Sequence, residues 1–101
     1  SLEKSHGFQR ALRNFGMDLQ LHSVAPRSPA ARMTVGALER QAKGAFFIVQ
    51  INRSDGDVHL NPSDNEILQE GDAVLTLGRP DRATAVARLF EPRQHGGARN
   101  L

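Results

Sequence analysis

The sequence of 101 residues contains no cysteine and carries 13 Lys and Arg against 11 Asp and Glu. This length allows one small domain, and the lack of cysteine excludes a disulfide scaffold, a thiolate metal site and a cysteine nucleophile. No apolar run approaches the ~20 residues that cross a bilayer. The chain starts at Ser1 without a signal-peptide pattern, so we expect a fragment of a longer protein.

The charge is distributed unevenly along the chain. Residues 1–43 hold seven Lys and Arg against three Asp and Glu, residues 44–90 hold four against seven, and residues 91–101 hold two against one. Neither a dense basic run nor basic residues interleaved with aromatic ones is present, although both are typical of nucleic-acid binding. We therefore expect no nucleic acid among the partners.

Residues 1–16 are expected to form an amphipathic helix or a linker from an upstream region. Phe8, Ala11, Leu12 and Phe15 recur at helical spacing, and Gly16 ends the pattern. This apolar stripe predicts packing on the same domain or on the upstream part of the chain. A role at a membrane surface is the alternative, and the shortness of the stripe disfavours it.

The first strand is predicted over Met17–Val24, where apolar and polar residues alternate. Two prolines within Ala25–Pro29 then require a loop. Thr34 is the expected N-cap of a helix that runs to about Lys43, and Gly44 is the expected stop. A strand, a helix and a second strand in this order suggest a crossover connection.

The most apolar strand is predicted over Phe46–Arg53. Strict alternation places Phe47, Val49 and Ile51 on one face, and the other face is also half apolar. A strand with two apolar faces lies beneath two layers or contributes one face to another subunit. We expect the second face to contact a second subunit. This face holds Phe46, Ile48, Gln50 and Asn52.

The rest of the chain predicts a small α+β domain. A hairpin turn at Asp55-Gly56 leads into a short strand, Val58–Leu60. A polar loop, a strand over Ala73–Leu77 and a helix over Pro80–Phe90 follow. The order is βαβββα, with a four-stranded mixed or antiparallel sheet and helices packed on it. Residues 17–90 form this domain, and residues 91–101 are expected to be a flexible tail.

No catalytic or metal-binding pattern is present in the sequence. The four histidines do not occur at metal-ligand spacing, and no serine lies in a nucleophile-elbow context. The acidic residues between Asp55 and Asp72 depart from the spacing of a calcium loop, so solvated turns explain them better than a metal site does. We expect no enzyme activity, no metal and no cofactor in this fragment.

Arg53 is the residue with the strongest indication of a special role. It ends the most apolar strand, immediately before the hairpin turn. An arginine at this place either binds an anion with its planar guanidinium or forms an ion pair, for which Asp55 and Asp57 are the nearest candidates. The ion pair is the more frequent arrangement.

Together, several segments in the correct order resemble the TrkA-C domain, also called the RCK C-terminal domain, over residues 18–90. The matching features are an Ile-x-Arg strand end, an Asn-Pro-x-Asp loop and a Gly-Asp pair before a Val-Leu-x-Leu-Gly strand. One departure is Arg32, where the family usually has glycine. The segments are 28–38, 44–53, 61–64, 68–72 and 74–78.

The resemblance implies a regulatory domain on the cytoplasmic side of potassium channels, potassium uptake systems and other cation transporters. It also implies a homodimer that acts on a transmembrane portion of the same or a partner chain. Some members bind a cyclic dinucleotide at the dimer interface, which here would involve Arg53, Phe47, Ile48 and His59. The alternative is a purely structural dimerisation module with no ligand.

Overall fold

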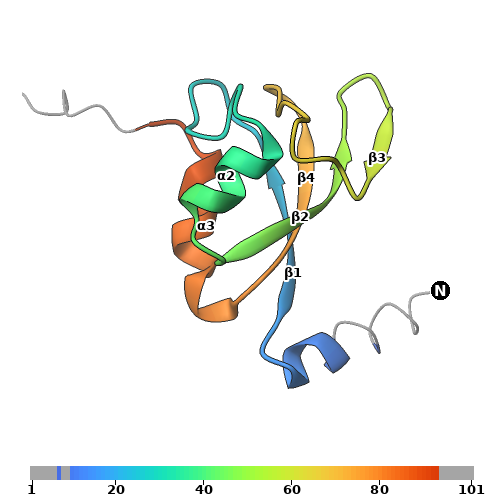
Figure 1. Cartoon of the computed structure of the whole chain (residues 1–101), viewed down its shortest axis with the longest axis vertical. Coiled ribbons are helices and arrows are strands. Elements are labelled where there is room, and N and C mark those ends of the chain that lie inside the picture. The colour runs from blue at the N-terminus through green and yellow to red at the C-terminus, as the bar shows by residue number, and fades with distance from the viewer. Residues whose placement is uncertain (1–6, 8–9, 94–101) are drawn as a thin grey trace, which may run out of the picture.

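The computed structural model describes residue 7 and residues 10–93. A four-stranded sheet carries two helices on one of its faces (Figure 1). The order βαβββα and the α+β class are as predicted. The elements are β1 (Asp18–Ser23), α2 (Val35–Gln41), β2 (Phe46–Asn52), β3 (Val58–Leu60), β4 (Ala73–Gly78), a 3₁₀ turn (Pro80–Arg82) and α3 (Ala83–Phe90).

The sheet is antiparallel throughout. Its strand order is β1-β4-β2-β3, and each neighbouring pair runs antiparallel. Strands β1 and β2 are therefore parallel to each other, with β4 inserted between them, so α2 connects two parallel strands as predicted. Strand β3 is an edge strand because it pairs with β2 alone.

A β-bulge in β2 corrects the predicted faces of this strand. The register shifts between Ile48, which is opposite Thr76, and Gln50, which is opposite Leu75, so Val49 is the extra residue. Beyond the bulge the alternation is reversed, and Ile51 lies on the same face as Phe46 and Ile48. The prediction that Ile51 shares a face with Phe47 was wrong for this reason.

The core lies between the sheet and the two helices. Strand β2 supplies Phe46, Ile48 and Ile51, all of which are buried, and Phe46 meets Phe90 of α3 edge to face. The predicted subunit contact through Phe46 and Ile48 was therefore wrong, because both residues belong to the core. The other buried apolar residues are Val24, Ala30, Val35, Leu38, Ala45, Leu68, Val74 and Val86.

The start of α2 is fixed by two local features. The Thr34 hydroxyl accepts a hydrogen bond from the Ala37 N–H at 3.2 Å, which confirms the predicted N-cap. Gly36 allows the loop after β3 to approach, since a Cβ at this position would lie 2.9 Å from the Cβ of Asp64. The glycine that weakens the helix is thus required by tertiary packing.

The N-terminal segment has little contact with this core. Residues 10–14 are helical and lie beyond the start of β1, away from α2 and α3 (Figure 1). Phe15 is 84% exposed, so the predicted stripe does not pack on the described domain at this residue. Packing on an upstream region stays a prediction. Phe8 and the greater part of the predicted tail, residues 94–101, lie outside the described residues.

His22 is expected to make the stability of the domain depend on pH. Its ring stacks on Phe90 at 4.6 Å, and its Nε2 is buried without a hydrogen-bond partner among the described residues. Burial lowers its pKa, although Glu91 acts in the opposite direction. The unfolded state therefore binds a proton more readily than the folded state. We expect the contribution of His22 to the unfolding free energy to be fully present above about pH 7 and to fall as the pH drops below about 6.5.

Urea unfolding between pH 5 and 8 measures this effect. The variant His22→Phe keeps an aromatic ring against Phe90 and cannot titrate, so the dependence on pH should be shallower in the variant. Equal slopes in the two proteins would show that His22 is not the responsible group.

Candidate functional site

The face of the sheet opposite the helices is open and apolar. From β1 it presents Leu19 and Leu21, which are paired with Leu77 and Leu75 of β4. Phe47, on the other side of Leu77, extends the same surface. Leu21 is 67% exposed and Phe47 is 53% exposed, which is unusual for large apolar side chains that share one face of a sheet.

We call this surface the open sheet face. None of the strand residues on this face is charged. Its polar members are Ser23, Gln50 and Asn52, and Val58 and Leu60 of β3 extend the apolar part to the edge of the sheet. An uncharged apolar surface can meet an identical copy of itself without like charges coming together. The full set is Leu19, Leu21, Ser23, Phe47, Gln50, Asn52, Val58, Leu60, Ala73, Leu75 and Leu77.

Arg53 lies on the other face of the sheet, within a charged cluster. Its Nη2 is 2.8 Å from Oε2 of Glu66, and its Nη1 contacts Oδ2 of Asp72 and donates to the Ile67 carbonyl at 2.9 Å. Nδ1 of His59 contacts the same Glu66 oxygen. We call Arg53, His59, Glu66 and Asp72 the Arg53 cluster.

The Arg53 cluster connects β2, β3 and the loop that leads to β4. The Asp72 carboxylate is almost fully buried, at 1% exposure, and it also accepts a hydrogen bond from the Gln69 N–H at 2.8 Å. Arg53 is 14% exposed. The expected ion pair of Arg53 is present, but its partners are Glu66 and Asp72 instead of Asp55 or Asp57. Asp55 instead accepts a hydrogen bond from the Asp57 N–H, as expected of a turn residue.

The structure brings together two of the four residues expected to bind a ligand. Arg53 and His59 meet through Glu66. Ile48 lies in the core at 5% exposure, and Phe47 lies on the open sheet face. The sequence analysis missed the leucines of β1 and β4, although their alternation was a usable signal.

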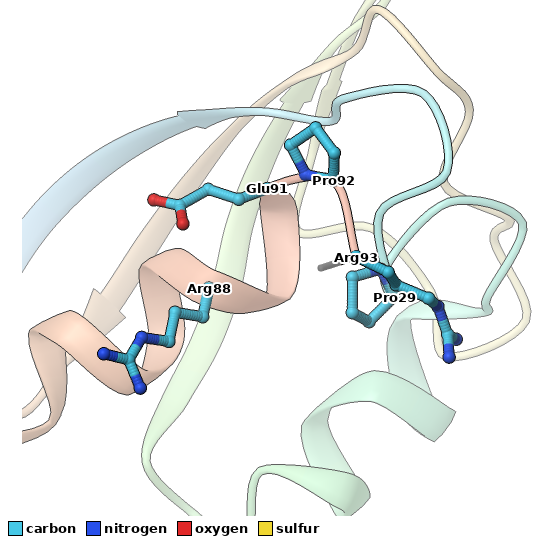
Figure 2. A pocket seen from close by; sticks show the side chains of 5 residues that line it. All are labelled: Pro29, Arg88, Glu91, Pro92 and Arg93. Carbon is cyan, nitrogen blue, oxygen red and sulfur yellow. The ribbon is translucent and has the colours of Figure 1, made fainter. Parts of the chain in front are cut away.

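Three further observations concern other kinds of site. In the part of the chain that the structure describes, no group of three or more His, Asp or Glu is arranged to hold a metal ion. None of the described helices is long and apolar enough to span a membrane. A hollow of about 640 Å³ lies at the end of α3 and is open and lined by Pro29, Arg88, Glu91, Pro92 and Arg93 (Figure 2).

A helix layer on one face and an uncharged apolar surface on the other define a small α+β domain suited to packing against a second protein surface. The particular family follows from comparison with known sequences. The sequence profile of the TrkA-C domain matches residues 19–91, and the chain belongs to this family of regulatory domains. Among curated proteins, none shows significant sequence similarity to the chain.

Solved structures show the same fold. The RCK_C domain dimer of S. agalactiae BusR in complex with c-di-AMP has 19% identity and a TM-score of 0.60, over 71% of this chain and 93% of that chain. The GsuK RCK domain has 20% identity and a TM-score of 0.62, over 84% of this chain and 18% of that chain.

A third structure bears on the prediction that nucleic acid is not among the partners. It is S. agalactiae BusR in complex with its busAB promoter DNA, with 19% identity and a TM-score of 0.61, over 71% of this chain and 35% of that chain. Identities this low show the fold alone. Because a protein of this fold is seen with DNA, the exclusion of nucleic acid has no support from the comparisons and stays a prediction.

Proposed function

We propose that the chain is a dimerising regulatory domain of a potassium channel or another cation transporter, on the cytoplasmic side of the membrane. In this proposal two copies join through their open sheet faces and act on a transmembrane portion of the same or a partner chain. The observation that carries it is the uncharged apolar surface around Leu21, Phe47 and Leu75. The proposed role involves no reaction and no cofactor.

The extent of the surface across the sheet and its composition suit such a dimer. A standard interface buries ~800 Å² on each partner, about a tenth of the surface of a small protein. Four strands contribute to the open sheet face, and the apolar side chains at its centre are those that stable interfaces bury most. A two-fold axis through the face would place each apolar side chain against the same set in the other copy.

We further propose that a cyclic dinucleotide binds near the Arg53 cluster and changes the dimer. A phosphate group of this ligand would compete with Glu66 for Arg53 and would also be within reach of the His59 ring. Releasing Glu66 would loosen the loop that precedes β4, which is one way to favour a different conformation. Regulation requires that the ligand binds two conformations with different affinity. Phe47 would influence the response to the ligand through the dimer surface. Ile48 would influence it through the core beneath β2.

Thermal unfolding of the full chain with and without c-di-AMP tests this ligand. We expect the unfolding midpoint to rise with ligand concentration because the ligand binds the folded state. His59→Ala should remove most of the rise, whereas the matched variant His22→Phe should keep it. An unfolding midpoint that c-di-AMP does not change would contradict the proposed ligand binding. It would not contradict the proposed dimer.

A second candidate function is a structural dimerisation module without a ligand. One observation favours it: the Arg53 guanidinium is already matched by two carboxylates. Under this alternative Phe47→Glu separates the subunits. No nucleotide changes the unfolding midpoint, either in the wild type or in variants of the Arg53 cluster.

A further inference from the structure

A second group of arginines surrounds a hollow at the end of the domain where the loop after β1 meets the chain beyond α3. The hollow measures about 340 Å³. Its lining comes from three segments that are distant in sequence, and it shares no residue with the Arg53 cluster or the open sheet face. The lining residues are Arg27, Ser28, Ala31, Arg32, Glu70 and Arg93.

The charge of this hollow is unbalanced. Three arginines and a single acidic residue, Glu70, line it. In the part of the chain that the structure describes, the arginines that form ion pairs are Arg13, Arg53 and Arg79, and none of the three around the hollow does so. Figure 2 shows the side chain of Arg93 pointing away from the carboxylate of Glu91.

The backbone holds these arginines in place. Arg27 and Arg32 have φ angles of 63° and 73°, in the left-handed region that favours glycine. The Arg93 N–H donates to the Arg27 carbonyl at 3.1 Å, and the Arg32 N–H donates to the Leu68 carbonyl at 2.7 Å. Long cationic side chains at two unfavourable backbone positions around one hollow point to a function for the cations.

Ser28 adds a polar group that lacks a partner. It is 4% exposed, it lines the hollow, and its hydroxyl oxygen is buried without a hydrogen bond in the described structure. A buried hydroxyl without a partner costs free energy and calls for an explanation, and an acceptor on a bound ligand is one explanation.

We propose that this hollow binds a small ligand carrying a phosphate or diphosphate group with at least two negative charges. Arginine is suited to this because its planar guanidinium donates two parallel hydrogen bonds to phosphate oxygens. The volume is near the lower limit of the ~300–1,000 Å³ typical of small-molecule sites. The three arginines line one hollow, which fits a small ligand better than the extended backbone of a nucleic acid.

Thermal unfolding of the full chain in inorganic pyrophosphate, at constant ionic strength set with NaCl, tests the proposal. We expect a rise of the unfolding midpoint that saturates with pyrophosphate. Arg32→Gly should raise the midpoint without pyrophosphate, because the left-handed φ is relieved, and should abolish the further rise. Ser28→Ala should keep the fold and weaken the response several-fold.

Lys43→Gly is the matched control. Lys43 also has a left-handed φ, of 53°, and carries the same charge, but it lies beyond the opposite end of α2. This variant should gain stability in the same way and keep the full response to pyrophosphate. The proposal is overturned if Arg32→Gly responds like the wild type, or if NaCl alone reproduces the rise. A response to a short DNA duplex without one to pyrophosphate would also overturn it, in favour of a nucleic-acid contact.

Discussion

Phe47→Glu is expected to convert the proposed dimer into a monomer without unfolding the domain. Phe47 is half exposed on the open sheet face, so a glutamate there remains hydrated in the monomer. In the dimer two glutamates would be buried in an uncharged surface, and a large aromatic contact would be lost twice. We expect a loss of about 2 kcal/mol or more in association, roughly a thirty-fold rise in Kd. Sedimentation velocity over a concentration series measures it.

Thr84→Glu is the control for this variant. It adds the same charge at an exposed position of α3, on the helix side of the molecule, and should leave association unchanged. Leu21→Glu, on β1, should reproduce the effect of Phe47→Glu because both residues belong to the open sheet face. Association that tolerates both of these variants would place the interface elsewhere.

Arg53→Met is expected to destabilise the domain by ~3–5 kcal/mol, because it leaves the buried carboxylate of Asp72 without its cation. This is a large part of the ~5–15 kcal/mol that stabilises a typical domain. Methionine keeps much of the apolar stem of the arginine, so the loss reports mainly the charge. Urea unfolding at pH 7.5 measures the change in unfolding free energy.

Two controls isolate the Arg53 cluster. In the double variant with Asp72→Asn the buried negative charge is removed, and the amide oxygen can still accept the Gln69 N–H, so the loss should be smaller than in Arg53→Met alone. Arg79→Met breaks an exposed pair with Asp81, at 3.0 Å, and should cost less than about 1 kcal/mol. Similar losses in Arg53→Met and Arg79→Met would contradict the structural role of the cluster.

The order of elements could be predicted because local signals agree with the fold. Gly16 and Asp55-Gly56 mark turns, Thr34 caps a helix, and alternation marks β1. The bulge at Val49 could not be predicted, since valine fits a regular strand as well as a bulged one. This extra residue reversed the alternation of β2 beyond Val49, so Ile51 joins Phe46 and Ile48 in the core. The face left for a dimer contact is therefore that of Phe47.

The partners of Arg53 show a second limit of prediction from the sequence. Asp55 and Asp57 are near in sequence, but the turn uses them locally, whereas Asp72 follows 19 residues later and meets Arg53 only because β4 pairs with β2. The arginine hollow likewise could not be predicted from the sequence, since three segments that are distant in sequence form it. The only sequence signal for it was Arg32 at a position where the family usually has glycine, and the φ of 73° gives the physical reason for that preference.

The mass of the wild-type chain in solution tests the central claim most directly. Sedimentation equilibrium of the full chain should give twice its mass of 11.1 kDa, with dissociation only at low concentration. A mass of 11.1 kDa at the highest concentration that stays soluble would contradict a dimer formed through the open sheet face.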